Sequence, residues 1–222
     1  MNVGRQLWVE LRNVWRVSAG LAVVLVGVFL VQRPDRVVTR AVAAGGPAWL
    51  VTVYAVAVPA FGAAFVVFLS SAYAAVEDDA ENVYHRLLVY PVSFSRLLLV
   101  KTLPVAVCGT GAALVLGGVA YYSLPRLRLV TVLAAVAVVG VAVVPVAVLV
   151  TLWYLWIDDP RIGTVVVFAV VSGGVVLSRL GPLAVSASPV TLALGGVAAV
   201  VVSYGVAAVA LIGLDLERLV VG

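Results

Sequence analysis

The chain has 222 residues, of which 64% are hydrophobic and only 11% are charged. A soluble domain carries about 25% charged residues, so this composition excludes a water-soluble enzyme or binding domain as the body of the chain. The net charge of +4 comes from basic residues scattered between apolar stretches, and this does not indicate nucleic-acid binding. Composition therefore predicts an integral membrane protein with a single domain over residues 1–222, whose surroundings are the lipid bilayer.

The first predicted element is an amphipathic helix over residues 1–16. Apolar side chains recur there at steps of three and four, with arginines largely on the other side: Val3, Leu7, Leu11, Val14 and Trp15 against Arg5, Arg12 and Arg16. Such a helix lies in the membrane interface with its arginines toward anionic headgroups, and Trp8 and Trp15 favour that position. The alternative is that the segment extends the first span into water. We expect the interfacial helix.

Six apolar stretches follow that are long enough, or nearly so, to cross a bilayer. They cover about residues 17–31, 48–76, 101–122, 129–157, 162–177 and 190–214. Pro59 and Pro145 lie inside the second and fourth stretches, and each is expected to free a backbone carbonyl and bend its helix. The Gly-Gly pairs at 45, 117, 173 and 195 are expected to allow close helix packing. The predicted fold class is all-α, a polytopic membrane protein with six transmembrane helices.

The distribution of basic residues predicts the orientation. With six spans, both termini share a side with residues 77–101 and the turn at 158–161. Eight of the 14 basic residues lie on that side, namely Arg5, Arg12, Arg16, Arg86, Arg96, Lys101, Arg161 and Arg218. By the positive-inside rule, we expect a multi-pass protein of the cell membrane with both termini in the cytoplasm.

Ionisable side chains are absent from the middle of the predicted spans. Ion-coupled carriers need such groups to hold the coupling charge, so we do not expect this chain to use an ion gradient by itself. No Gly-Gly pair is followed by the Lys-Ser/Thr of a nucleotide-binding loop. Cys108 is the sole cysteine, so neither a disulfide nor a cysteine metal site is expected. We predict no catalytic residue, no metal site and no cofactor, and any energy for work would come from a partner.

The most informative stretch is the charged segment at 77–101, between the second and third predicted spans. It begins with Glu77, Asp78 and Glu81, continues as Leu87-Leu88-Val89-Tyr90-Pro91-Val92-Ser93, and ends at Lys101, ten residues after the proline. This pattern resembles the cytoplasmic coupling loop of type-2 ABC transporter permeases (ABC-2 type). The resemblance of architecture covers the whole chain, and the motif covers about 25 residues. It departs from the family at Asn82-Val83-Tyr84-His85, where Gly-Thr-Leu-Glu is usual.

The resemblance implies a permease subunit of an ATP-driven exporter or flippase for a hydrophobic or amphipathic substrate. Its partners would be an ABC ATPase subunit in two copies, which binds ATP and Mg²⁺, and a second permease in a homodimer or heterodimer. The implied cytoplasmic coupling helix would dock on the ATPase through Glu77, Asp78, Glu81, Tyr84, His85, Leu87, Leu88, Pro91, Ser93 and Lys101. The translocation route in this family lies at the dimer interface, and candidate polar residues along it are Thr52, Tyr54 and Ser172.

Other interpretations of the chain stay open. One is a membrane subunit of the haem-exporter type used in cytochrome c maturation, and another is a non-transporting membrane scaffold. In the scaffold, the charged segment would recruit a partner other than an ATPase. The alternative to any docking role is a solvated loop whose leucines continue the bundle. An intramembrane enzyme is the least favoured, since only scattered hydroxyls such as Ser70, Ser71, Ser172 and Ser203 are present.

Overall fold

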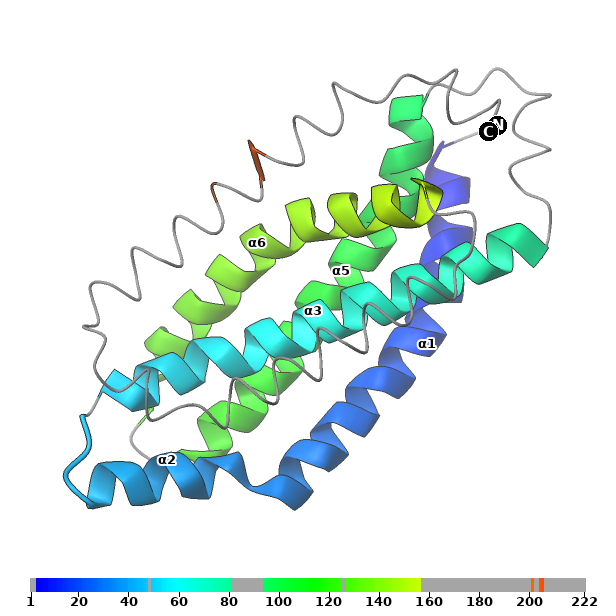
Figure 1. Cartoon of the computed structure of the whole chain (residues 1–222). Helices are drawn as coiled ribbons and strands as arrows, with labels where there is room; N and C mark the ends of the chain where they lie inside the picture. Colours follow the sequence, from blue (N-terminus) through cyan, green and yellow to red (C-terminus); the bar gives the residue numbers. More distant parts are fainter. Residues whose placement is uncertain are drawn as a thin grey trace.

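A computed structural model describes residues 3–47, 49–80, 94–124, 127–156, 201 and 204–205. Its helices are α1 (Val3–Gln32), α2 (Pro34–Ala43), α3 (Trp49–Ala80), α5 (Phe94–Ser123) and α6 (Leu129–Trp156) (Figure 1). The described residues contain no strand. Four helices, α1, α3, α5 and α6, are long and apolar enough to cross a membrane. The described part of the chain is therefore all-helical, and its four candidate spans are those of a membrane protein.

The four long helices form a bundle in which successive members run in opposite directions (Figure 1). Helices α3, α5 and α6 all contact one another, and α1 packs on α5 and α3. The starts of α1 and α5 therefore lie at the same end of the bundle as the ends of α3 and α6. We call this the Lys101 end, and the opposite end, which carries α2, the α2 end.

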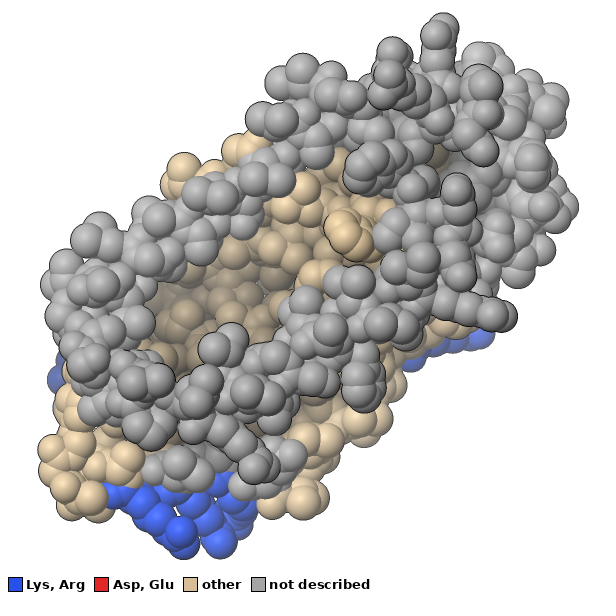
Figure 2. Space-filling model, viewed as in Figure 1, with Lys and Arg blue, Asp and Glu red and all other residues tan. Residues whose placement is uncertain are grey.

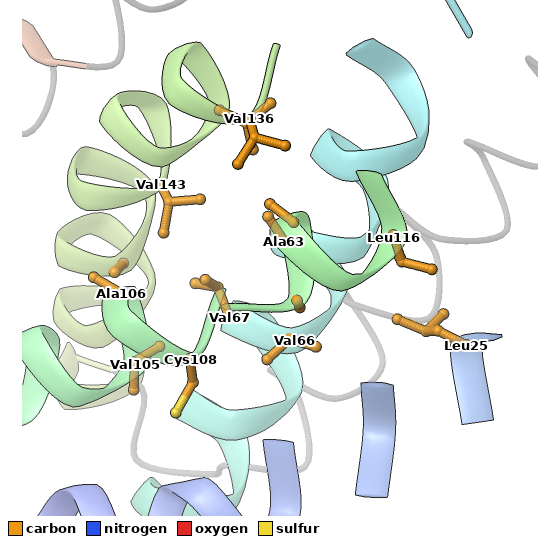
Figure 3. Close-up of a cluster of buried hydrophobic side chains, with 14 of the residues drawn as sticks. Leu25, Ala63, Val66, Val67, Val105, Ala106, Cys108, Leu116, Val136 and Val143 are labelled. Carbon is orange, nitrogen blue, oxygen red and sulfur yellow. The ribbon is translucent and has the colours of Figure 1, made fainter. Parts of the chain in front are cut away.

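Small side chains let α5 approach its neighbours closely. A Cβ added to Gly109 would lie 2.6 Å from Cγ2 of Val67 in α3 and 3.1 Å from Cγ1 of Val143 in α6. Val66 and Val67 of α3 and Val105 of α5 are almost completely buried, and Figure 3 shows them in the cluster of apolar side chains that these helices share. Lipid tails are as apolar as these side chains, so helices in a membrane associate through such close packing more than through a hydrophobic driving force.

The two Gly-Gly pairs that the structure describes have different structural roles: one packs against a neighbouring helix and the other ends a helix. Gly117 packs against α6, because an added Cβ would lie 2.8 Å from Cγ2 of Val136, whereas Gly118 meets no atom within 4 Å. The pair at 45 is not a packing site but ends α2, with Gly45 at a φ of +87°. The pairs at 173 and 195 lie outside the described residues.

Helix α1 includes the segment over residues 1–16 that is predicted to be an interfacial helix. Residues 3–32 form one continuous helix of 30 residues, about 45 Å long at 1.5 Å per residue. No glycine or proline lies between Gly4 and Gly20 to break it. Val14 and Ser18 are buried by the packing of α1 on its neighbours, while Trp8 and Trp15 remain exposed. The apolar side of the amphipathic segment is thus covered partly by protein.

Helix α2 was not predicted. Arg33, at a left-handed φ of 48°, turns the chain out of α1, and Pro34 opens the new helix at a position where its missing N–H costs nothing. At the other end the Gly46 N–H donates to the Ala41 carbonyl and the Gly45 N–H to the Val42 carbonyl. This is the Schellman arrangement, which favours glycine because it requires a positive φ. Two backbone turns therefore fix α2 between the ends of α1 and α3 (Figure 1).

Pro145 lies inside α6, and the helix continues through it. Proline has no N–H to donate, so the carbonyl four residues earlier, at Val141, loses its helical partner. The hydroxyl of Tyr204 donates a hydrogen bond of 2.9 Å to that carbonyl. Tyr204 belongs to the sixth predicted span, 190–214. Apart from Val201, Tyr204 and Gly205, the fifth and sixth predicted spans lie outside the described residues.

Candidate functional site

Helix α3 carries the acidic start of the charged segment beyond its apolar part. The part of α3 that could span a membrane ends at Ala75, but the helix continues to Ala80. Glu77 and Asp78 lie in this extension, which projects the helix about 7 Å further at 1.5 Å per residue. The second apolar stretch therefore continues without a break as a helix into the charged residues.

The centre of the predicted coupling element is not described. Glu81, Tyr84, His85, Leu87, Leu88, Pro91 and Ser93 lie outside the described residues. Helix α5 begins at Phe94, directly after Ser93. The structure thus describes the two helices that flank the segment, at one end of the bundle.

Among the predicted coupling residues, Lys101 is the one whose side-chain position the structure describes. Its Nζ lies 2.7 Å from Oε1 of Glu10 in α1, and the two side chains are 9% and 23% exposed. Sequence reasoning expected Lys101 to contact an ATPase and did not identify Glu10 as a partner. One signal was present: Lys101 is the sole lysine of the chain, and Glu10 is the sole acidic residue before Asp35.

The ion pair joins α1 to the beginning of α5. An ion pair whose side chains are largely buried is stable only with good geometry, because both charges have lost much of their hydration. The 2.7 Å separation is that of a charge-assisted hydrogen bond. Any displacement of the first turns of α5 by the preceding segment would therefore act on α1 directly.

A second polar contact lies deeper in the same part of the bundle. The hydroxyls of Ser18 and Ser70 form a buried hydrogen bond of 2.7 Å between α1 and α3, and the Cys108 thiol of α5 has Ser18 as a side-chain partner. Ser18 follows Glu10 by eight residues and Cys108 follows Lys101 by seven, so both contacts lie about 11 Å below the ion pair. Helix α1 thus contacts α5 through polar groups at two levels, and α3 at the deeper one.

Hydroxyls suggested for other roles are distributed without a catalytic arrangement among the described residues. Ser71 is next to Ser70, but its buried Oγ has no hydrogen-bond partner among the described residues. Thr52 is exposed on α3. Tyr54 is buried and its ring lies 6.0 Å from that of Phe29, and no described residue forms a hydrogen bond with its hydroxyl. Ser172 and Ser203 lie outside the described residues.

The part of the chain that the structure describes contains no group of three His, Cys, Asp or Glu side chains able to hold a metal ion. Its polar contacts connect helices, and they can transmit force or set the relative positions of α1, α3 and α5. Comparisons of the chain with protein-family models, with curated proteins and with solved structures find no match.

Proposed function

We propose that this chain is the permease subunit of a type-2 ABC transporter, which moves a hydrophobic or amphipathic substrate across the cell membrane. A separate ATPase supplies the energy, and a second permease completes the route. The observation that carries the proposal is the continuation of α3 past its apolar part into Glu77 and Asp78, the first residues of the segment that resembles a coupling loop.

The physical logic is that of a lever. Pushing on residues 81–93 would displace the helices on both sides of the segment, α3 and α5. Because Lys101 of α5 is paired with Glu10 of α1, α1 would follow. Rigid-body motion of packed helices is a common way to convert nucleotide-dependent closure into a conformational change.

The chemistry of the segment fits an ATPase surface. Its acidic residues can pair with basic groups at the rim of a cleft, while Tyr84, Leu87 and Leu88 can fill an apolar floor. Buried aromatic and aliphatic anchors dominate such interfaces, and truncation of a strong anchor costs about 2 kcal/mol or more. That is about a thirtyfold loss of affinity.

The test is to look for an ABC ATPase gene next to the gene for this chain, to co-purify the chain with that ATPase, and then to measure ATP hydrolysis in proteoliposomes. We expect a stable complex, and the triple substitution Tyr84→Ala, Leu87→Ala and Leu88→Ala should weaken it at least thirtyfold. A matched control is Tyr122→Ala, Leu129→Ala and Leu133→Ala, which removes the same side-chain types from exposed positions near the α2 end. The control should bind as well as the native chain.

Two results would contradict the proposal. One is binding of the ATPase by the triple variant at native affinity, which would remove the coupling role of the segment. The other is substrate movement by the chain alone, driven only by an ion gradient. Capture of a partner other than an ATPase through the same three residues would favour the scaffold, and haem co-purifying with an ATPase complex would favour the haem-exporter subunit.

A further inference from the structure

Three arginines follow one side of α2 and the turn before it. Arg33, Arg36 and Arg40 are all exposed, and their steps of three and four residues place them as neighbours on a helix surface. We call these residues the arginine stripe. Figure 2 shows Lys and Arg side chains gathered along the edge of the molecule where Figure 1 places α2.

The bundle holds the opposite side of α2. Val38 packs against the hydrophobic core, and Ala41 and Val42 are half-buried. The left-handed turn at Arg33 and the glycine turn at Gly45 fix both ends of the helix. Rotation of α2 would expose Val38 and break these turns, so the stripe faces away from the bundle permanently.

The position of α2 defines what this stripe meets. The apolar part of α1 ends at Val31 and that of α3 begins at Trp49, so α2 lies where the hydrocarbon region ends and lipid headgroups begin. Asp35 is the one acidic residue of α2, and its place in the first turn complements the helix dipole. The stripe therefore has a net positive charge at phosphate depth.

We propose that the arginine stripe binds the phosphate groups of anionic phospholipids in the leaflet that faces the α2 end. Guanidinium groups suit this partner because they donate two parallel hydrogen bonds to a phosphate. Each basic residue near an anionic lipid surface strengthens association about fivefold. The inference requires only that α1 and α3 cross a bilayer, and it is independent of any transport activity.

The test measures lipid enrichment beside α2 by energy transfer. A donor dye is attached at Ala43→Cys, an exposed position, in a Cys108→Ser background. The protein is reconstituted in phosphatidylcholine vesicles with a small share of acyl-chain-labelled acceptor, either phosphatidylglycerol or phosphatidylcholine. We expect a several-fold excess of the labelled phosphatidylglycerol near the dye. The excess should fall at 1 M salt, where the screening length is about 3 Å.

Three variants separate charge from geometry. Arg33→Gln, Arg36→Gln and Arg40→Gln together should abolish the excess, while lysine at the same positions should keep part of it. Asp35→Asn, on the same helix, should leave it intact or raise it. If the triple glutamine variant does not yield a helical, monodisperse protein, Arg36→Gln with Arg40→Gln preserves the turn at Arg33 and should still lower the excess severalfold. Equal transfer to both lipids in the native protein, or an undiminished excess in a folded glutamine variant, would overturn the proposal.

Discussion

The two ends of the bundle use charged residues in opposite ways. At the Lys101 end, a lysine and a glutamate are largely removed from solvent and tie α5 to α1. At the α2 end, arginines face outward, and backbone turns at Arg33 and Gly45 hold the structure. An ion pair can break and re-form when a neighbouring segment moves, whereas a glycine turn is fixed by backbone sterics. The two ends therefore differ in what holds them together: an ion pair between side chains at the Lys101 end, and backbone turns at the α2 end.

The largest expected effect comes from breaking the ion pair at the Lys101 end. Lys101→Met leaves the Glu10 carboxylate partly buried without this partner. Removal of one member of a buried pair costs about 3–5 kcal/mol, and the 23% exposure of Glu10 reduces this to about 2–3 kcal/mol. The free energy of unfolding in detergent micelles with added denaturant measures the loss.

The matched control for this variant is Lys101→Met combined with Glu10→Gln. The double variant has no stranded charge, so it should recover at least half of the lost stability. If the double variant is as unstable as the single one, the cost does not arise from the pair, and the contrast between the two ends fails.

A smaller effect is expected at the α2 end. Gly45 adopts a positive φ, a region in which a residue with a Cβ costs about 1–2 kcal/mol. Gly45→Ala should therefore lower the free energy of unfolding by about 1 kcal/mol, and proteolysis between α2 and α3 should become faster. Gly111→Ala is the control, because Gly111 lies inside α5 with no atom within 4 Å of an added Cβ. It should be neutral or stabilising by up to about 1 kcal/mol, and equal losses in both variants would contradict a special role for the turn.

The smallest expected effect on stability comes from the hydrogen bond of Ser70, which can be compared with the neighbouring Ser71. Ser70 and Ser71 are adjacent and both are buried, but only Ser70 has a hydrogen-bond partner among the described residues, the Ser18 hydroxyl. Ser70→Ala should cost about 0.6 kcal/mol, the average for an interhelical hydrogen bond in a membrane protein. Ser71→Ala should be neutral or slightly stabilising, because it removes an unpaired polar atom. Thermal unfolding of the two variants side by side measures the difference, and a reversed order would show that the Ser18–Ser70 contact does not hold α1 to α3.

Much of the helical layout could be predicted because apolar length and proline or glycine positions control it. The stretch expected at 129–157 corresponds to Leu129–Trp156, and the one at 48–76 corresponds to Trp49–Ala80. The apolar part of α3 ends at Ala75, one residue before the predicted end of the stretch. The helix itself continues to Ala80, because a helix stabilised by its apolar part can extend into charged residues without a break. The fifth and sixth spans stay predictions.

Helix α2 and the ion pair show what sequence reasoning could not reach. The start and stop signals of α2 were present, with proline and aspartate at its beginning and Gly45 after its end. Helix α2 has only ten residues, and an apolar pattern of that length is too short to predict a helix between two long spans. Glu10 and Lys101 are 91 residues apart, and no periodicity connects positions so distant. Most of the candidate coupling residues lie outside the described residues, so their role is still a prediction from the resemblance.

The hydrogen bond from Tyr204 to the Val141 carbonyl has a consequence for how the protein is made. Its two partners are 63 residues apart, and ribosomes add about 5–20 residues per second. The carbonyl freed by Pro145 therefore exists for roughly 3–13 s of synthesis before Tyr204 is joined to the chain. An unpaired carbonyl is costly in hydrocarbon. During this interval the Val141 carbonyl must therefore contact water, the insertion machinery or another helix. Release of α6 into the lipid is thereby linked to the synthesis of residues far downstream, and a chain truncated before Tyr204 would leave the helix with an exposed acceptor in the membrane.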